Sequence, residues 1–214
     1  RLHYAYPTAF PDDVIDVMAS EPKICKYLDI PFQHISDRML TAMKRRHTKA
    51  DALALIERLR ERIPDIALRT TLLVGYPTET EQDMQELEQF VRDVRFDRLG
   101  VFAYSEEEGT YSARELRDDV PEEEKQRRVD RIMRLQEGIS LENNLARVGR
   151  TMRVIVDSRQ GDYYVARSQY DSPEVDQEIL IPAAAHQLRR GHFYDARITA
   201  AEDYDLYGEV VPRR

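Results

Sequence analysis

The sequence has one cysteine, no tryptophan and no long apolar run, and each of these absences excludes a class of protein. A single cysteine, Cys25, in 214 residues rules out an internal disulfide framework and any multi-cysteine metal site within these residues. No apolar stretch approaches the roughly 20 residues that span a bilayer, and no secretory signal opens the chain. These absences predict a soluble, cytoplasmic protein.

Basic charge is scarce as well. The chain has 32 Lys and Arg residues against 40 Asp and Glu residues, for a net charge of −8. A protein that coats nucleic acid normally carries a basic excess. The composition therefore argues against that class of protein, and it leaves a basic protein partner open.

Standard catalytic signatures are missing too. The chain has no Walker loop, no G-x-G-x-x-G, no H-E-x-x-H and no G-x-S-x-G. Its five histidines are scattered, and none lies at ligand spacing from a carboxylate or cysteine. We therefore expect His47, His186 and His192 to be surface or turn residues, and Cys25 to be a small buried hydrophobe.

In the first two thirds of the chain, strand-like and helix-like segments alternate. This alternation predicts βα units and a parallel sheet. Four strands with no matching start imply that the sheet is incomplete, so the expected fold class is α/β. Thr80 with Asp83 three residues later predicts a capped helix start. The expected strands cover residues 1–6, 27–32, 66–75 and 99–104.

The last third has a different pattern. Pro121 and the three glutamates after it open a long helix, which we expect to end near Gly149. Five short alternating stretches then predict a small antiparallel β-barrel of the OB-like kind. We expect two domains, residues 1–149 and 150–214. The five expected strands cover residues 152–156, 163–166, 178–181, 192–198 and 206–211.

Polar groups follow three of the expected strands, where parallel α/β barrels carry their ligand-binding residues. At Gln33 and His34, a ligand role and a role in satisfying backbone groups of the next helix are equally favoured. Arg69 is a charge within a buried strand and needs an anionic partner, either a ligand carboxylate or an acidic side chain. Gly75 would let a ligand approach the backbone closely. The three glutamates after Tyr104 are more typical of a solvated loop than of catalysts.

Taken in order, these segments resemble the radical-SAM methylthiotransferase family. The matching stretches are YLDIPFQHIS, LRTTLLVGYPTET and FAYSEEEGT, and the opening RLHYAYP is similar to the strand before them. The expected small barrel resembles the TRAM domain of the family, through RSQYDSPEVDQEILI and AEDYDLYGEVV. The resemblance implies an incomplete radical-SAM (β/α) barrel closed by the long helix, followed by a TRAM domain.

The pair Gln33 and His34 is the informative position within this family. The tRNA-modifying branch typically has a QSGS-like sequence there, whereas the QHIS form resembles the branch that methylthiolates an aspartate of a small-subunit ribosomal protein. From Arg150 onward there are 9 basic and 11 acidic residues, a net of −2, which suits a basic protein better than RNA phosphates. A tRNA methylthiotransferase, and a non-catalytic RNA- or ribosome-binding module, remain alternatives.

The resemblance implies S-adenosylmethionine and two 4Fe–4S clusters as cofactors of the full-length enzyme. One cluster, held by three cysteines, would cleave S-adenosylmethionine, and the resulting radical would abstract hydrogen from the aspartate β-carbon. Cluster ligation requires closely spaced cysteine thiolates, and these residues contain none. The resemblance therefore implies that the chain is a C-terminal fragment that is inactive by itself.

The resemblance also implies residues that contact S-adenosylmethionine. Gln33 and His34 would meet ribose or methionine groups, and Arg69 the cofactor carboxylate. Thr71, Leu73 and Gly75 match the strand that lies against the adenine, and Phe102 and Tyr104 would flank it.

One residue departs from the family pattern. The family usually has glycine where this chain has Thr78. Glycine there indicates a positive φ, which a β-branched residue tolerates poorly. Either the turn differs or the site is slightly reshaped.

Overall fold

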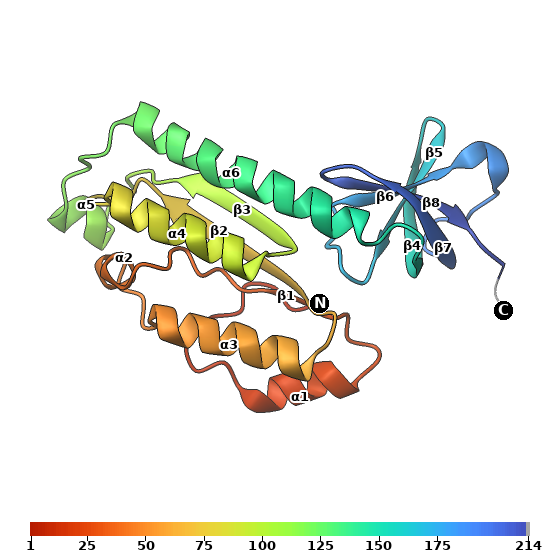
Figure 1. Ribbon diagram of the computed structural model, residues 1–214, viewed down its shortest axis with the longest axis horizontal. Coiled ribbons are helices and arrows are strands. Elements are labelled where there is room, and N and C mark those ends of the chain that lie inside the picture. The colour runs from red at the N-terminus through yellow and green to blue at the C-terminus, as the bar shows by residue number, and fades with distance from the viewer. Residues whose placement is uncertain (213–214) are drawn as a thin grey trace. The chain divides into compact units, whose positions relative to one another are not determined.

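A computed structural model describes residues 1–212 of the chain (Figure 1). The described chain divides into two compact units. We call the first the sheet unit; it consists of residues 2–22 and 28–136. We call the second the barrel unit; it consists of Arg1, residues 23–27 and residues 137 onward.

The sheet unit is built around a three-stranded sheet in the order β1 (Tyr27–Asp29), β2 (Ala67–Val74) and β3 (Arg98–Ala103). Strands β2 and β3 are parallel, as the βα alternation predicts. The first expected strand is reduced to one parallel bridge between Leu2 and Leu28. The incomplete α/β barrel expected from the sequence is therefore confirmed.

Helices of the sheet unit follow its strands, and Figure 1 shows α3 and α4 alongside the sheet. Both begin with a complete capping box, Thr48 with Asp51 and Thr80 with Asp83, so the prediction at Thr80 is confirmed. The short helix α5 was not expected. The helices that begin in this unit are α1 (Asp12–Ser20), α2 (Asp37–Ala42), α3 (Lys49–Arg62), α4 (Glu81–Val94), α5 (Tyr111–Glu115) and α6 (Glu122–Leu145).

Strand β2 separates two faces of the sheet. Its residues Leu68, Thr70, Leu72 and Val74 are fully buried, whereas the residues between them are partly exposed. This alternation follows from the two-residue period of a strand. The buried face packs on a core that includes Phe32, Phe90 and Phe96, whose ring centroids lie 5.4 to 6.2 Å apart. The other face is the more exposed of the two.

The barrel unit contains a closed five-stranded barrel in the order β4-β5-β6-β8-β7. Neighbouring strands are antiparallel except β6 and β8, which are parallel. Its core is aliphatic and includes Val154, Ile179 and Ile198. The strands are β4 (Thr151–Gln160), β5 (Tyr163–Ser168), β6 (Glu178–Pro182), β7 (Phe193–Ala201) and β8 (Asp205–Val210), with a 3-10 turn η1 (Ala183–Ala185).

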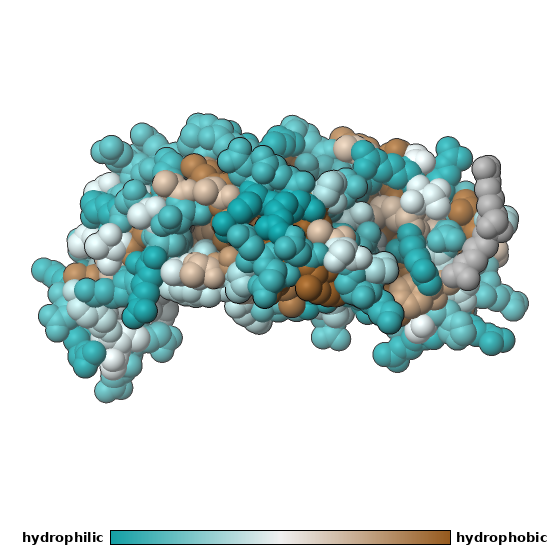
Figure 2. Space-filling model, turned by 90° about the horizontal axis from the view of Figure 1, so that it is seen from below, coloured by the Kyte–Doolittle hydropathy of each residue, from teal (hydrophilic) through white to brown (hydrophobic). Residues whose placement is uncertain are grey.

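The surface drawn in Figure 2 is mainly hydrophilic, and its hydrophobic residues occur in small groups. Among residues 1–212, no helix is both long and apolar enough to cross a membrane.

Candidate functional site

The candidate site lies at the carboxyl edge of the three-stranded sheet, and Gln33 is its most unusual backbone position. Gln33 has φ +68°, in the left-handed region that favours glycine. Its N–H donates to the Thr71 carbonyl (2.9 Å), and its carbonyl accepts from Leu73 N–H (2.7 Å). These two bonds hold the chain beside β2 in a conformation that costs of order 1 kcal/mol, a cost typical of functional sites.

His34 is fully buried directly behind Gln33. Its Nδ1 accepts the backbone N–H groups of Ile35 (2.8 Å) and Ser36 (3.0 Å). The proton therefore lies on Nε2, which donates to Glu79 Oε1 at 3.3 Å. His34 does satisfy the backbone ahead of α2, one of the two alternatives left open by the sequence. Its contact with a cofactor stays a prediction.

Glu79 connects this histidine to the next strand and to α6. Its second oxygen accepts the N–H of Gly75 and, at 3.0 Å, Nη1 of Arg128. Arg128 also donates to Glu124, one turn earlier (2.9 Å). A buried carboxylate needs both a counter-charge and hydrogen bonds, and Glu79 has both. The network therefore links the segment after β1, at His34, to the end of β2, at Gly75. Glu79 and Arg128 were not among the site residues predicted from the sequence.

Arg69 finds an acidic side chain within the chain. Its Nη1 lies 3.3 Å from Oδ1 of Asp29 on β1, and the Asp29 side chain is almost fully buried. His3 lies 3.9 Å from the other oxygen of Asp29. The side chain of Arg69 is 17% exposed on the open face of the sheet, so a role toward the cofactor carboxylate stays a prediction.

The open face beyond Arg69 is small and apolar. Thr71 pairs with Gly100, and Leu73 pairs with Phe102. Phe102 is 61% exposed, and a Cβ added at Gly100 would meet only Phe102 and Arg69, at 3.8 and 3.9 Å. The two strands therefore present small and apolar groups on this face, with the aromatic ring of Phe102 exposed among them.

Gly75 and Tyr104 occupy surroundings that the sequence did not indicate. Gly75 has φ +74°, and a side chain there would overlap the methylene carbons of Lys125. Lys125 Nζ lies 5.3 Å from the Tyr104 ring centroid and 2.5 Å from Asp118. Tyr104 is buried and packs edge-on against Tyr76 at 5.1 Å. Glycine is needed at residue 75 because Lys125 of α6 approaches it closely. Ligand contact at Gly75 and at Tyr104 stays a prediction.

Lys125 and Tyr76 have shifted pKa values in this cluster. Burial alone would lower the pKa of Lys125, but the hydrogen bond and charge of Asp118 outweigh it and raise the pKa. Burial raises the pKa of the Tyr76 hydroxyl. Lys125 therefore stays charged, and Tyr76 stays a neutral hydroxyl.

Thr78 retains the positive φ of the glycine it replaces. Its φ is +72°, so the turn keeps its form. Its N–H donates to Asp119 (2.8 Å), and its carbonyl accepts from Arg38 (2.8 Å). These bonds hold a conformation that its branched side chain disfavours.

One prediction about the histidines was wrong. His47 is 4% exposed, because its ring packs edge-on against Phe32 at 6.1 Å. His186 is partly exposed and His192 is exposed. Cys25 is a free cysteine that is only partly buried.

The chain does not fit an iron–sulfur cluster. It has one cysteine, and cluster ligation takes several thiolates. In residues 1–212, no group of three or more His, Cys, Asp or Glu side chains could hold a metal ion. The open face of β2 and β3, by contrast, offers an exposed aromatic ring, Phe102, and the guanidinium of Arg69.

Comparison with known proteins identifies both regions of the chain. The Radical SAM superfamily model matches residues 3–91, and the TRAM domain model matches residues 148–211. The chain is 52% identical over 211 residues to the ribosomal protein uS12 methylthiotransferase RimO of Bacteroides thetaiotaomicron, covering 99% of this chain and 48% of that protein. Against the protein of the same name from Parabacteroides distasonis, identity is 54% over 211 residues, covering 99% and 49%.

Among solved structures, coproporphyrinogen III oxidase (HemN) from Escherichia coli has a similar fold, with a TM-score of 0.52 and 16% identity over 78% of this chain and 46% of that one. The chain spans about half the length of the curated relatives it matches. Both regions are matched within this one chain, and the RimO relatives align with it over 99% of its length. The chain therefore belongs to the radical-SAM methylthiotransferase family.

Proposed function

We propose that the complete protein adds a methylthio group to the β-carbon of an aspartate in ribosomal protein uS12, using S-adenosylmethionine. The observation that carries this proposal is the identity with relatives of that name, which extends over nearly the whole chain. The QHIS form of residues 33–36 supports the same branch of the family.

The open face of β2 and β3 is the proposed seat of S-adenosylmethionine. Thr71, Leu73 and Phe102 offer a flat apolar surface for the adenine, since Phe102 is exposed beside Leu73. Gly75, His34 and Tyr104 complete this part of the site, the last two from buried positions. When bound, S-adenosylmethionine supplies the radical and the methyl group of the reaction.

Arg69 and Gln33 are proposed to orient the polar end of the cofactor. Arg69 is held by Asp29, its side chain is 17% exposed, and a planar guanidinium matches the geometry of a carboxylate. Gln33 has its backbone locked by two hydrogen bonds. Its side-chain amide can donate and accept, which suits ribose hydroxyls or the methionine group.

The clusters of the family are not assigned to residues of this chain, because its single cysteine cannot ligate one. The contribution proposed for this chain is therefore binding and orientation. No reaction step is assigned to a side chain here.

The barrel unit is the proposed contact for the ribosomal protein. From Arg150 onward the sequence has a net charge of −2, and an acidic surface would steer a basic partner. We further propose that the protein acts in the cytoplasm, where ribosomal proteins are available, alone or on the ribosome.

The test is a product assay with the enzyme expressed from its complete coding sequence. The reconstituted enzyme is incubated separately with uS12 and with tRNA, and both are analysed by mass spectrometry. We expect the mass of one methylthio group on an aspartate of uS12 and none on tRNA. A methylthio group on tRNA alone, or on neither substrate with an enzyme that still cleaves S-adenosylmethionine, would overturn the proposal.

A further inference from the structure

Two cationic side chains of the sheet unit, Lys44 and Arg45, have no acidic partner among residues 1–212. They follow α2 closely in the sequence, and both are accessible: Lys44 is exposed and Arg45 is partly exposed. Each charged end lies over a tyrosine ring instead of a carboxylate. The two side chains therefore keep a positive charge that the described chain does not neutralise.

The backbone that carries these cations is fixed at the end of α2. The N–H of Lys44 donates to the Thr41 carbonyl (3.0 Å), and the N–H of Arg45 donates to the Leu40 carbonyl (2.8 Å). This pair of bonds forms a Schellman motif, whose left-handed residue is usually glycine. Here that residue is Lys44, with φ +57°. A lysine held in this conformation is a strained residue of the kind that gathers at functional sites.

The tyrosine rings orient the charged ends. Lys44 Nζ lies 4.1 Å from the ring centroid of Tyr111, at the start of α5, and the guanidinium carbon of Arg45 lies 5.8 Å from that of Tyr6. Both tyrosines are exposed. A cation over a ring face keeps its charge, and its N–H donors are left for a further partner. The rings therefore position two cations without neutralising them.

The loop with these cations lies at the carboxyl edge of the sheet, beside the open face. Met43, which precedes Lys44, packs against the buried cluster that contains Tyr76 and Tyr104, and so does Leu73 of the open face. These two tyrosines follow the ends of β2 and β3 closely. Figure 1 shows α2 and α5 next to each other at one end of the sheet. Parallel α/β barrels bind their ligands at this edge.

The acidic residues nearby leave the two cations unpaired. The loop between β3 and α5 carries Glu106, Glu107 and Glu108, which are exposed and form no ion pair with Lys44 or Arg45. A guanidinium with free donors matches a carboxylate, and an ammonium adds a second charge. The arrangement therefore favours an acidic group of a bound substrate.

We propose that Arg45 and Lys44 bind the side-chain carboxylate of the aspartate that receives the methylthio group. This inference rests on the proposed function, in which the β-carbon of that aspartate is modified. The carboxyl group is bonded to this carbon, so a contact with the carboxylate also positions the carbon. A site built to bind a charged group rejects an analogue that lacks it. Arg45 and Lys44 thus select aspartate over asparagine.

The test measures the binding of uS12 to the enzyme expressed from its complete coding sequence. Two forms of uS12 are titrated by calorimetry, one with its target aspartate and one with asparagine there, without a reductant so that no turnover occurs. We expect the parent enzyme to bind the asparagine form about tenfold more weakly, because a charged hydrogen bond is lost. Arg45→Gln should bind both forms with the same, weaker affinity, and Arg45→Lys should restore part of the difference. Lys44→Gln should reduce the difference without abolishing it.

Arg46→Gln is the matched control, because it removes one positive charge from the next residue, which is exposed and lies over neither tyrosine ring. It should leave the preference for aspartate unchanged. General electrostatics would act in the opposite direction, since a loss of positive charge favours a basic partner.

Equal binding of the two forms by the parent enzyme would overturn the inference, and so would equal changes in Arg45→Gln and Arg46→Gln. The product assay with uS12 and tRNA separates this failure from that of the proposed function. If the parent enzyme modifies uS12 but binds both forms equally, only this inference fails. If the methylthio group appears on tRNA alone, both fail.

Discussion

The two units of this chain are stabilised in different ways. In the barrel unit, five strands form a closed hydrogen-bonded barrel around an aliphatic core. The sheet unit has an open sheet. Of the eight non-glycine residues with positive φ among residues 1–212, seven lie in the sheet unit, and the exception is Glu174. The buried network of His34, Glu79 and Arg128 also lies in the sheet unit.

Most of the strained backbone lies in the sheet unit, and two of its strained residues, Gln33 and Thr78, lie with the buried network at the carboxyl edge of the sheet. Backbone strain and buried charge both cost stability, and both are typical of functional sites. The sheet unit therefore gives up part of its stability at the edge where we propose that S-adenosylmethionine binds, whereas the barrel unit closes around an aliphatic core. Four substitutions test or refine this comparison.

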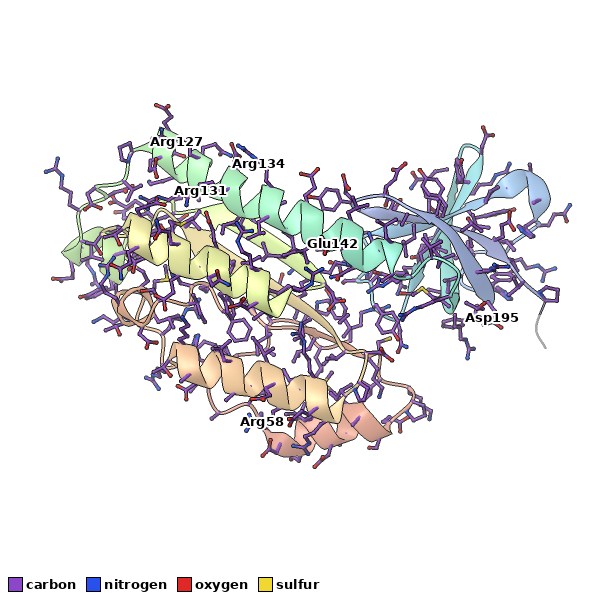
Figure 3. The ribbon with its side chains drawn as sticks, in the orientation of Figure 1. Arg58, Arg127, Arg131, Arg134, Glu142 and Asp195 are labelled. Carbon is purple, nitrogen blue, oxygen red and sulfur yellow. The ribbon has the colours of Figure 1, made fainter. Side chains whose placement is uncertain are left out.

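The largest effect is expected from breaking the buried network. Arg128→Ala leaves Glu79 buried without its counter-charge, which should lower the free energy of unfolding of the sheet unit by about 3–5 kcal/mol. Arg131→Ala is the matched control on α6: it also removes contacts to two glutamates, Glu81 and Glu88, but near the surface, where we expect about 1 kcal/mol or less. Figure 3 shows Arg131 on α6 above α4. Urea unfolding measures both, and equal losses would contradict the account.

The second effect concerns the approach of α6 to Gly75. Gly75→Ala introduces a methyl group into the Lys125 side chain at a positive φ, which should cost about 3 kcal/mol. Gly109→Ala has φ +82° but open space around the added carbon, so only the backbone cost of about 1 kcal/mol is expected. Thermal unfolding compares the two variants. A Gly75→Ala loss no larger than that of Gly109→Ala would show that the close approach is unimportant.

The third effect depends on pH. Burial alone would raise the pKa of Asp83, but hydrogen bonds from Arg38, Thr80 and Ser36 outweigh it and lower the pKa. A depressed folded-state pKa gives stability that is present above the unfolded value of 3.8 and is lost as the pH falls. Asp83→Asn should therefore cost about 2 kcal/mol at neutral pH, and the loss should shrink below about pH 4. Urea unfolding at several pH values checks this, and a pH-independent difference would contradict it.

The smallest effect is a gain. Thr78→Gly should stabilise the sheet unit by about 1 kcal/mol, because glycine adopts φ +72° without steric cost. Glu174→Gly in the barrel unit (φ +64°) should gain less, since glutamate is not β-branched. The melting temperatures of the two variants measure the difference. A loss of stability in Thr78→Gly would mean that its side-chain bond to Arg38 outweighs the strain.

The parts of this structure that depend on short sequence patterns could be predicted. The capping box of Thr80 and Asp83, the existence of a strand at residues 67–74 and the long helix after Pro121 follow from neighbouring residues. The prediction for His47 was wrong because its burial is imposed by Phe32, fifteen residues away in sequence.

The candidate site depends on contacts that the sequence does not reveal. Glu79 meets His34 across 45 residues and Arg128 across 49. Gln33 has a backbone conformation that its residue type disfavours. Such features follow from the assembled sheet and not from local propensity.

The proposed binding of S-adenosylmethionine by Gln33 depends on its side chain, which extends from a strained backbone (φ +68°). Gln33→Gly tests it directly, because glycine keeps the backbone bonds to Thr71 and Leu73 and removes both the strain and the side chain. Calorimetric titration of the complete enzyme with S-adenosylmethionine should give at least a tenfold weaker affinity for Gln33→Gly, with unfolding stability equal to or above that of the parent. An unchanged affinity in a stably folded variant would contradict the account.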